Sequence, residues 1–167
     1  AVVSRGLGDV YKRQEHGTEV GTVLSSHPEI DVISFTGSSR TGKIIMANAS
    51  DTIKHVSLEL GGKAPALVFD DADLDKSVAE IRRGVLALNG QMCTSISRIL
   101  VQDSVYDSVR QRLKEAFTSV KIGDASAAGT ELGPIIDRAN QQRLAGIIER
   151  AADQAQMVIH GGVGDGK

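Results

Sequence analysis

The 167-residue chain has a single cysteine, no tryptophan and few other aromatic residues. A lone cysteine cannot form an internal disulfide, which excludes a small secreted scaffold held together by such bonds. The aromatic share of 3% leaves too few rings for stacking on single-stranded nucleic acid. The formal net charge of −2 provides no basic face for a nucleic-acid partner. We therefore expect no nucleic-acid partner.

Long apolar runs are also missing. No stretch approaches the roughly 20 residues of a membrane span, and no signal-peptide core follows the N-terminus. We therefore expect no membrane partner and a reducing, cytoplasmic location. The cysteine and the four histidines show no metal-ligand spacing, so no metal site is expected. The first residue is Ala rather than Met, which indicates a fragment or a processed chain.

Strand-like and helix-like segments alternate along the sequence. β-branched residues and alternation indicate strands, and apolar residues at helical spacing indicate helices. Strands are expected at 31–35, 54–60, 66–69 (apolar and buried), 98–101 and 157–160. Helices are expected at 15–27, 43–49, 73–89, 105–120 and 138–154. Crossover helices between strands predict an α/β layered fold with mainly parallel strands. Residues 1–14 show no clear period, and Gly61-Gly62 is the best candidate for a domain boundary.

The turn GSSRTGK at 37–43 follows a strand and opens a helix. Its spacing matches the phosphate loop of nucleoside triphosphate hydrolases, but Ile44 stands where that loop needs a hydroxyl to hold magnesium. Backbone N–H groups at a helix start, with the Ser38 hydroxyl, would also suit the diphosphate of a dinucleotide. A plain glycine-rich turn is the third interpretation, and the turn alone does not decide among them.

Cys93 follows Gly90 and Gln91 directly after a predicted helix and precedes Thr94 and Ser95. A lone cysteine is more often a small buried apolar residue than a nucleophile. The polar surroundings at the end of an element favour an accessible thiol. The sequence leaves both interpretations open.

Glu59 stands in the predicted strand HVSLELGG, where Val56, Leu58 and Leu60 share one face and His55, Ser57 and Glu59 share the other. A glutamate on an edge strand would simply face solvent. In a parallel sheet covered on both sides, the second face would also be buried. A carboxylate at the carboxyl end of such a strand lies where open α/β sheets bind ligands, and partial desolvation would raise its pKa toward that of a useful base.

Three short motifs occur in a distinctive order: FTGS at 35–38, ELGGK at 59–63 and GQMC at 90–93. With PALVFDDADLD at 65–75 and LGPII at 132–136, they closely resemble the aldehyde dehydrogenase superfamily. The resemblance covers about residues 16–162. Residues 1–14 do not match the family, and we interpret them as a segment foreign to the gene.

The resemblance implies an NAD(P)-dependent oxidation of a small-molecule aldehyde to a carboxylic acid. Cys93 would be the nucleophile, passing through a thiohemiacetal and a thioester, and Glu59 would be the base that activates water. Because relatives that transfer the acyl group to coenzyme A lack a glutamate there, Glu59 favours hydrolysis. The implied cofactor-binding residues are Thr36, Gly37, Ser38, Gly42, Leu60 and Gly61.

The resemblance also implies the organisation of the parent enzyme. Residues 15–61 would end an NAD(P)-binding, Rossmann-type domain, and 62–167 would begin an α/β catalytic domain. The parent enzyme would be a homo-oligomer, either a dimer or a tetramer, and the isolated fragment would be inactive. The alternatives are a non-catalytic structural or binding fragment of the same fold and a nucleotide-binding protein of the phosphate-loop type. The sequence decides neither the aldehyde nor the choice between NAD and NADP.

Overall fold

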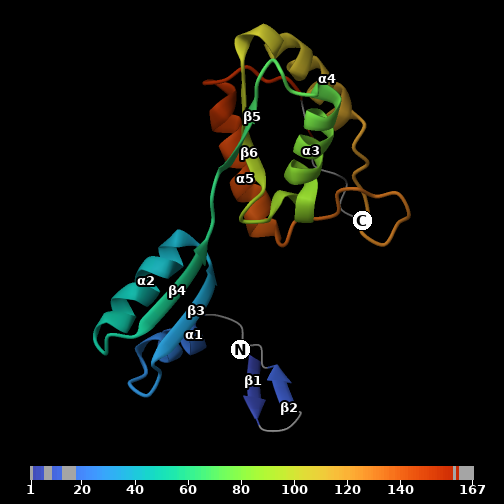
Figure 1. Cartoon of the computed structure of the whole chain (residues 1–167). Coiled ribbons are helices and arrows are strands. Elements are labelled where there is room, and N and C mark those ends of the chain that lie inside the picture. The colour runs from blue at the N-terminus through green and yellow to red at the C-terminus, as the bar shows by residue number, and fades with distance from the viewer. Residues whose placement is uncertain (1, 6–8, 13–17, 160, 162–167) are drawn as a thin grey trace. The chain divides into compact units, whose positions relative to one another are not determined.

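Two pairs of parallel strands form the framework of the chain (Figure 1). The computed structural model describes residues 2–5, 9–12, 18–159 and 161. Strand β3 (Val32–Gly37) pairs with β4 (His55–Leu60), and β5 (Ala64–Val68) pairs with β6 (Ile96–Val101). The chain divides into two compact units, Ala1–Gly61 and Gly62–Lys167. The expected α/β organisation with parallel strands is confirmed.

Helices follow or precede these strands in the order expected of crossover connections. They are α1 (Glu19–Ser26), α2 (Ser39–Ser50), α3 (Leu74–Leu86), α4 (Tyr106–Thr118) and α5 (Arg138–Ala152), with short 3-10 segments η1 (Ala87–Gly90) and η2 (Asp103–Val105). None of the helices in the described ranges is long and apolar enough to cross a membrane. Strands β1 (Val2–Arg5) and β2 (Asp9–Lys12) pair in antiparallel fashion, in a segment for which the sequence showed no period.

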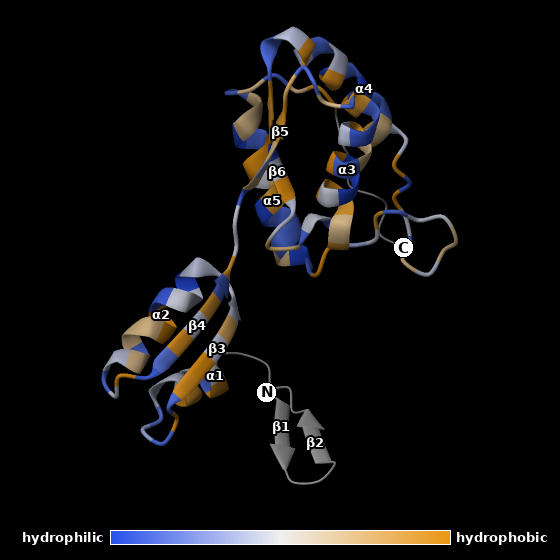
Figure 2. Ribbon diagram, viewed as in Figure 1, coloured by the Kyte–Doolittle hydropathy of each residue, from blue (hydrophilic) through white to orange (hydrophobic). Residues whose placement is uncertain are grey.

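In the first unit, α2 packs on one face of the β3–β4 pair and α1 packs on α2. Val56, Leu58 and Leu60 are half-buried under α2, whereas His55, Ser57 and Glu59 are exposed. The expectation that this second face is covered is therefore wrong for the unit as described. The reason is that α2 lies against the leucine face and α1 adds to the same layer. Figure 2 shows the alternation of apolar and polar residues along these strands.

Lys54 is the one buried charged side chain among the described residues. Its ammonium group donates to the carbonyl oxygens of His27 (2.6 Å) and Ile30 (2.8 Å) and to the Thr52 hydroxyl (2.6 Å). These bonds tie the turn after α1 to the segment that enters β4. Because the charge is offset by oxygen acceptors rather than by a carboxylate, all three acceptors are needed to make its burial tolerable.

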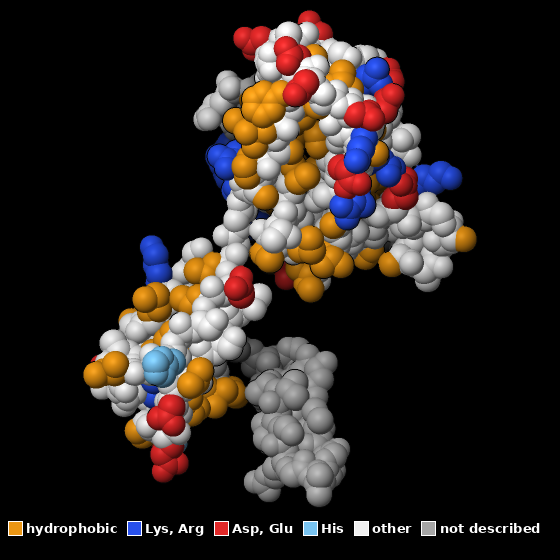
Figure 3. All heavy atoms as spheres, viewed as in Figure 1, with side chains coloured by type: hydrophobic (Ala, Val, Ile, Leu, Met, Phe, Trp, Pro, Cys, Tyr) orange, Lys and Arg blue, Asp and Glu red, His pale blue; other side chains and the backbone are white. Residues whose placement is uncertain are grey.

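The second unit has its core between the β5–β6 pair and helices α3 and α4. Val68, Ile81 and Val109 are buried there, each on a different element. Leu67 and Phe69 are 60% and 57% exposed, so the prediction that strand 66–69 is buried holds only for part of it. Strand alternation explains this, because Val68 points to the helices and its neighbours point away. Hydrophobic side chains accordingly remain visible on the surface of this unit in Figure 3.

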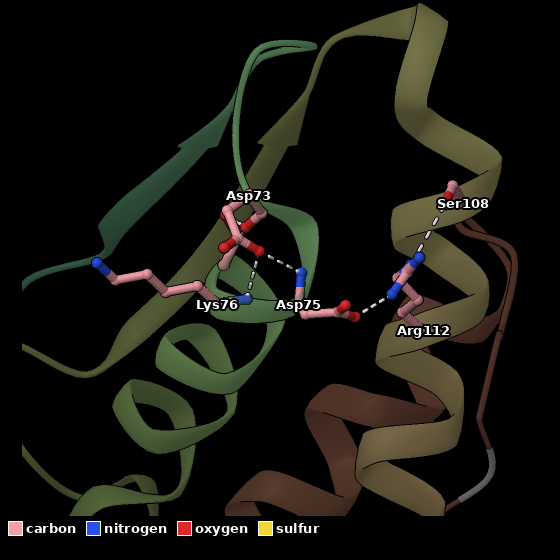
Figure 4. A network of polar contacts seen from close by, with 6 residues as sticks. Asp73, Asp75, Lys76, Ser108 and Arg112 are labelled. Atoms are coloured by element: carbon pink, nitrogen blue, oxygen red, sulfur yellow. Dashed lines mark hydrogen bonds and ion pairs between the residues drawn. The ribbon is translucent and has the colours of Figure 1, made fainter.

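Helix α3 begins at an acidic cap and is tied to α4 across their surfaces (Figure 4). The Asp73 carboxylate accepts from the backbone N–H groups of Asp75 and Lys76, both at 3.1 Å. The Asp75 carboxylate in turn pairs with Arg112 of α4. An aspartate cap satisfies N–H groups that have no partner within the helix, so the sequence itself sets where α3 starts.

Several expected elements differ from the structure: the helix expected at 43–49, for example, begins earlier, at Ser39, and two further differences concern the second unit. The helix predicted at 73–89 ends at Leu86, after which Leu88 is 70% exposed rather than on the core stripe. The strand predicted at 157–160 is wrong for 157–159, which form no strand, while His160 lies outside the described residues. A strand needs a neighbour to pair with, and none of the described strands pairs with residues 157–159.

Candidate active site

Strands β3 and β4 end at the same edge of the first unit. Their parallel register pairs Thr36 with Glu59 and Gly37 with Leu60. Thr36, Gly37 and Glu59 are exposed, whereas Leu60 is half-buried. The structure thus brings together, at one carboxyl edge, the expected base and residues expected to bind cofactor, which is where parallel α/β sheets bind ligands.

The turn into α2 has the features of an anion site. Ser38 is the N-cap of α2, and its hydroxyl accepts from the Thr41 N–H at 3.1 Å. The first turn of α2 has no acidic residue, while Arg40 and Lys43 lie in its first two turns and are exposed. The positive end of the helix dipole and its unpaired N–H groups therefore meet no competing negative charge. This set of donors fits the diphosphate of a dinucleotide.

Gly42 lies on the buried side of α2, away from the exposed turn. A Cβ built on Gly42 would come within 3.0 Å of Leu60 Cδ2 and 3.4 Å of Leu58 Cδ1. The absence of a side chain therefore allows α2 to approach β4 closely. Among the residues expected to bind cofactor, Gly42 is thus a packing residue in this structure. Gly61, by contrast, is exposed and has open space around it.

Cys93 lies in the second unit, in a turn closed by the Ser95 N–H donating to the Met92 carbonyl at 3.1 Å. Its side chain is exposed, as the polar surroundings in the sequence favoured. Ser95 is buried beneath the turn, 6% exposed. The thiol is consequently accessible to a reagent while the turn that carries it is anchored in the unit.

The backbone just before Cys93 is left-handed over three consecutive residues. Leu88 (φ 48°), Asn89 (φ 56°) and Gly90 (φ 70°) all have positive φ. Glycine adopts this region at low cost and asparagine does so more readily than most residues, whereas a residue such as Leu88 costs roughly 1–2 kcal/mol. Sequence reasoning missed this feature, although an Asn-Gly pair is a known signal for left-handed backbone.

A second segment runs beside the cysteine turn. A Cβ built on Gly62 would lie 3.4 Å from the Cys93 carbonyl oxygen. Arg98, on β6, donates from Nε (3.1 Å) and Nη2 (2.9 Å) to the Lys63 carbonyl. These contacts hold Gly62 next to the cysteine turn and Lys63 next to β6. No sequence pattern predicted them.

The predicted site residues therefore fall into two groups. Thr36, Gly37, Ser38, Glu59 and Leu60 gather in the first unit, and Cys93 lies in the second. Within the described ranges no three His, Cys, Asp or Glu side chains gather in a way that could hold a metal ion. Away from these residues, in the segment between α4 and α5, hydrogen bonds from Ser126 lower the pKa of Asp124, and a hydrogen bond from Arg82 lowers the pKa of Glu131.

Comparison with known proteins gives a consistent answer. The family model described as "Aldehyde dehydrogenase family" matches residues 10–167. Betaine aldehyde dehydrogenase 1 of Oryza sativa subsp. japonica is 42% identical over 146 residues, which are 87% of this chain and 29% of that protein. The mitochondrial succinate-semialdehyde dehydrogenase of Arabidopsis thaliana is 41% identical over 144 residues, which are 86% of this chain and 27% of that protein.

Solved structures agree with the sequence matches. Betaine aldehyde dehydrogenase of Staphylococcus aureus in complex with NAD+ superimposes with a TM-score of 0.80 at 40% identity, over 83% of this chain and 28% of that one. An aldehyde dehydrogenase from Bartonella henselae gives a TM-score of 0.81 at 36% identity, over 87% and 30%. These likenesses confirm the fold that the resemblance implied. The chain spans less than a third of the length of each of these relatives.

Proposed function

Because this chain belongs to the aldehyde dehydrogenase family, we propose that it carries the nucleophile and the base of an enzyme that oxidises a small-molecule aldehyde to a carboxylic acid. The observation that carries the proposal is the register of β3 and β4, which sets Glu59 beside Thr36 at the edge where the α2 turn begins. A base next to a diphosphate-type turn is the arrangement that this chemistry needs.

The first unit would bind NAD or NADP. Gly37 and Ser38 would meet the diphosphate, together with the N–H groups at the start of α2, and Thr36, Leu60 and Gly61 would line the nicotinamide side. Gly42 would support this site indirectly, because the absence of a side chain lets α2 approach β4. The cofactor supplies the acceptor for the hydride that leaves the aldehyde carbon. The solved relative from Staphylococcus aureus that contains NAD+ supports this class of cofactor.

Cys93 would provide covalent catalysis. Its sulfur would attack the aldehyde carbon and form a C–S bond while the C=O π bond opens and the thiol proton passes to the carbonyl oxygen, giving a thiohemiacetal. The exposed position of the thiol in an anchored turn is suited to this step, because a nucleophile must reach the substrate in one defined direction. After the hydride has left the former aldehyde carbon, that carbon remains bound to sulfur as a thioester.

Glu59 would release the product. Its carboxylate would take a proton from water, and the water oxygen would attack the thioester carbon, so that the C–S bond breaks and the acid leaves. This role requires Glu59 and Cys93 to face one substrate in the assembled enzyme. A glutamate at this position favours hydrolysis over transfer of the acyl group to coenzyme A.

The wider properties of the parent enzyme follow the same proposal. We infer a cytoplasmic homo-oligomer, a dimer or a tetramer, and no activity for the isolated 167 residues. The relatives named above act, by their names, on betaine aldehyde and succinate semialdehyde. These two aldehydes carry opposite charges, so the likeness supports the class of substrate but no particular aldehyde.

The test compares three variants of the parent enzyme in a rapid-mixing experiment that follows reduced cofactor. Cys93→Ala should give no reduced cofactor at all, because no covalent intermediate can form. Glu59→Gln should give a burst of about one equivalent per active site followed by very slow turnover, because the acyl-enzyme forms but is not hydrolysed. Glu29→Gln, an exposed glutamate in the same unit, is the matched control and should behave as the unaltered enzyme. A Glu59→Gln variant without a burst, or oxidation that continues in Cys93→Ala, would falsify the assignment.

A further inference from the structure

We propose that Asn89 and Gln91 are positioning residues for Cys93, which they hold by joining the cysteine turn to the backbone of residues 133–136. Residues 133–136 are called the brace below. The proposal rests on the proposed function in one respect, since positioning matters for catalysis only if Cys93 is the nucleophile. The physical joint between the two segments stands on contacts of its own.

The first observation is the unusual backbone that leads to the cysteine. Leu88 (φ 48°, ψ 41°) and Asn89 (φ 56°, ψ 34°) adopt left-handed conformations before Gly90 (φ 70°). Leu88 gains nothing in return through burial, because its side chain is 70% exposed. A conformation that the local sequence disfavours persists only where surrounding contacts impose it. The contacts that do so here come from the brace.

Asn89 uses both ends of its amide on the brace. Its Oδ1 accepts from the Gly133 N–H at 3.2 Å, and its Nδ2 donates to the Pro134 carbonyl at 3.0 Å. A Cβ built on Gly133 would lie 3.6 Å from Asn89 Nδ2 and 3.3 Å from Ala125 Cβ, so the close approach favours a residue without a side chain at 133. The Asn89 side-chain amide thus accepts one hydrogen bond from the backbone of the brace and donates one to it, as the backbone of a neighbouring strand would.

Gln91 completes the joint on the other side of the left-handed stretch. Its Oε1 accepts from the Ile136 N–H at 2.9 Å, while its own backbone N–H donates to the Leu88 carbonyl at 3.0 Å. The same residue therefore links the brace and closes the left-handed stretch. Cys93 follows two residues later, in the turn that the Ser95 N–H closes on the Met92 carbonyl. Fixing Gln91 thereby limits the directions in which the thiol can point.

The segment just before the brace is anchored, through Glu131, to the helix from which the cysteine segment emerges. The Glu131 carboxylate pairs with Arg82 of α3 and accepts from the Lys121 N–H at 3.1 Å. Arg82 also donates from Nε to the Ala116 carbonyl of α4 at 3.1 Å. The path from α3 through the brace to Gln91 is therefore a closed loop of contacts. These contacts restrain the residues that lead into the cysteine turn.

The test is residue-resolved hydrogen exchange on the 15N-labelled 167-residue chain. The measured quantity is the exchange rate of the Ser95 amide divided by that of the buried Val109 amide, which reports global opening. A rise in this ratio therefore reflects local opening at the cysteine turn rather than a global loss of stability. Asn89→Gly keeps the left-handed backbone but removes both amide bonds, and Gln91→Ala removes the bond to Ile136. Each should raise the ratio roughly fivefold or more, as expected for the loss of a hydrogen bond.

Two further variants separate positioning from general bracing. Gln91→Glu retains an oxygen acceptor for the Ile136 N–H and should restore the ratio to that of the unaltered chain. Gln102→Ala removes a comparable amide bond, to the Asp70 carboxylate at 2.7 Å, at the opposite end of β6 from the cysteine turn, and should leave the ratio unchanged. If Asn89→Gly and Gln91→Ala speed exchange at Gly133 and Ile136 but leave the Ser95 ratio unchanged, the contacts only brace residues 133–136 and the proposal is overturned. Neither aldehyde nor cofactor is needed, so failure here is distinct from failure of the Cys93 assignment.

Discussion

Gly42 and Leu60 touch across the interface between α2 and β4, so that a Cβ on Gly42 would lie 3.0 Å from Leu60 Cδ2. Leu60 directly follows Glu59 and pairs in register with Gly37. The packing of one helical glycine therefore bears on the position of the proposed base and on the turn that would hold the cofactor. Close approach of helix and strand is a familiar use of glycine in dinucleotide-binding folds.

Gly42→Val should destabilise the first unit by about 2 kcal/mol, because the added methyl groups collide with Leu60 and with Leu58. The measurement is the free energy of local opening from hydrogen exchange of the β4 amides. Gly21→Val is the matched control, since Gly21 also lies in a helix but has nothing within 4 Å of a built Cβ. Equal effects of the two substitutions would show that α2 and β4 are not tightly packed at this point.

Ile53→Gly should stabilise the first unit by about 1 kcal/mol. Ile53 has φ 53° and ends α2 in a Schellman motif, in which its N–H donates to the Ser50 carbonyl (3.2 Å) and the Lys54 N–H donates to the Ala49 carbonyl (3.1 Å). Glycine is favoured at this position, and a β-branched residue is strained there. The side chain is 89% exposed, so its removal loses little packing.

The same hydrogen-exchange measurement checks this expectation on the β4 amides. Ile44→Gly, at an exposed position inside α2, is the control and should destabilise the unit, because glycine in a helix interior costs about 1 kcal/mol. A loss of stability in Ile53→Gly similar to that in the control would contradict the assignment of strain to Ile53.

Local patterns in the sequence predicted most of the elements of this fold. The helical stripe that includes Val109 and the alternation that includes Leu58 both reflect which side of an element faces the core, and that information is local. The turn at 37–43 was recognised for the same reason, because its glycine spacing is a local pattern. The cap that Ser38 makes on a helix beginning at Ser39 was not predicted.

The parts that escaped prediction depend on contacts between residues distant in the chain. The bonds from Asn89 to Gly133 and Pro134 join segments more than forty residues apart. The exposure of Glu59 depends on which face of the β3–β4 pair the helices cover, and the alternation of residues along the strands does not predict that face. A strand at 157–160 was predicted from composition, which does not reveal whether a pairing neighbour exists.

Lys54→Met should destabilise the first unit by about 2 kcal/mol. The substitution keeps an unbranched side chain of similar length but removes the Lys54 donor from the Ile30 carbonyl and leaves the His27 carbonyl with only the Ile30 N–H. The measurement is again the exchange of the β4 amides, which follow Lys54 directly. Lys43→Met, which removes an exposed cation from the same unit, should have an effect within about 0.5 kcal/mol. If both variants are equally stable, the ammonium group of Lys54 does not hold the turn after α1.

The stability of the second unit should fall in acid, and Glu131 should be one of the residues responsible. Its hydrogen bond from Arg82, helped by the Lys121 backbone N–H, lowers the pKa of the Glu131 carboxyl below its ordinary value. The Ser126 hydroxyl and N–H likewise lower the pKa of Asp124. Since an unfolded glutamate titrates near about pH 4.3, the unfolded chain binds protons first as the pH falls. The contribution of Glu131 to the free energy of unfolding is therefore complete above that pH, and it is lost as the pH drops through the pKa of Glu131 in the folded chain.

Glu131→Gln should accordingly reduce the slope of stability against pH between about 5 and 3, because the glutamine no longer binds a proton. It should also reduce the stability at neutral pH, since the charged partner of Arg82 is gone. The measurement is urea unfolding followed by circular dichroism across this range of pH. Part of the slope should survive in Glu131→Gln, because Asp124 titrates in the same direction, and the double variant with Asp124→Asn should flatten it further. A slope in Glu131→Gln identical to that of the unaltered chain would mean that the pairing with Arg82 contributes nothing to the anchoring of the brace, and the cysteine turn would then depend on Asn89 and Gln91 alone.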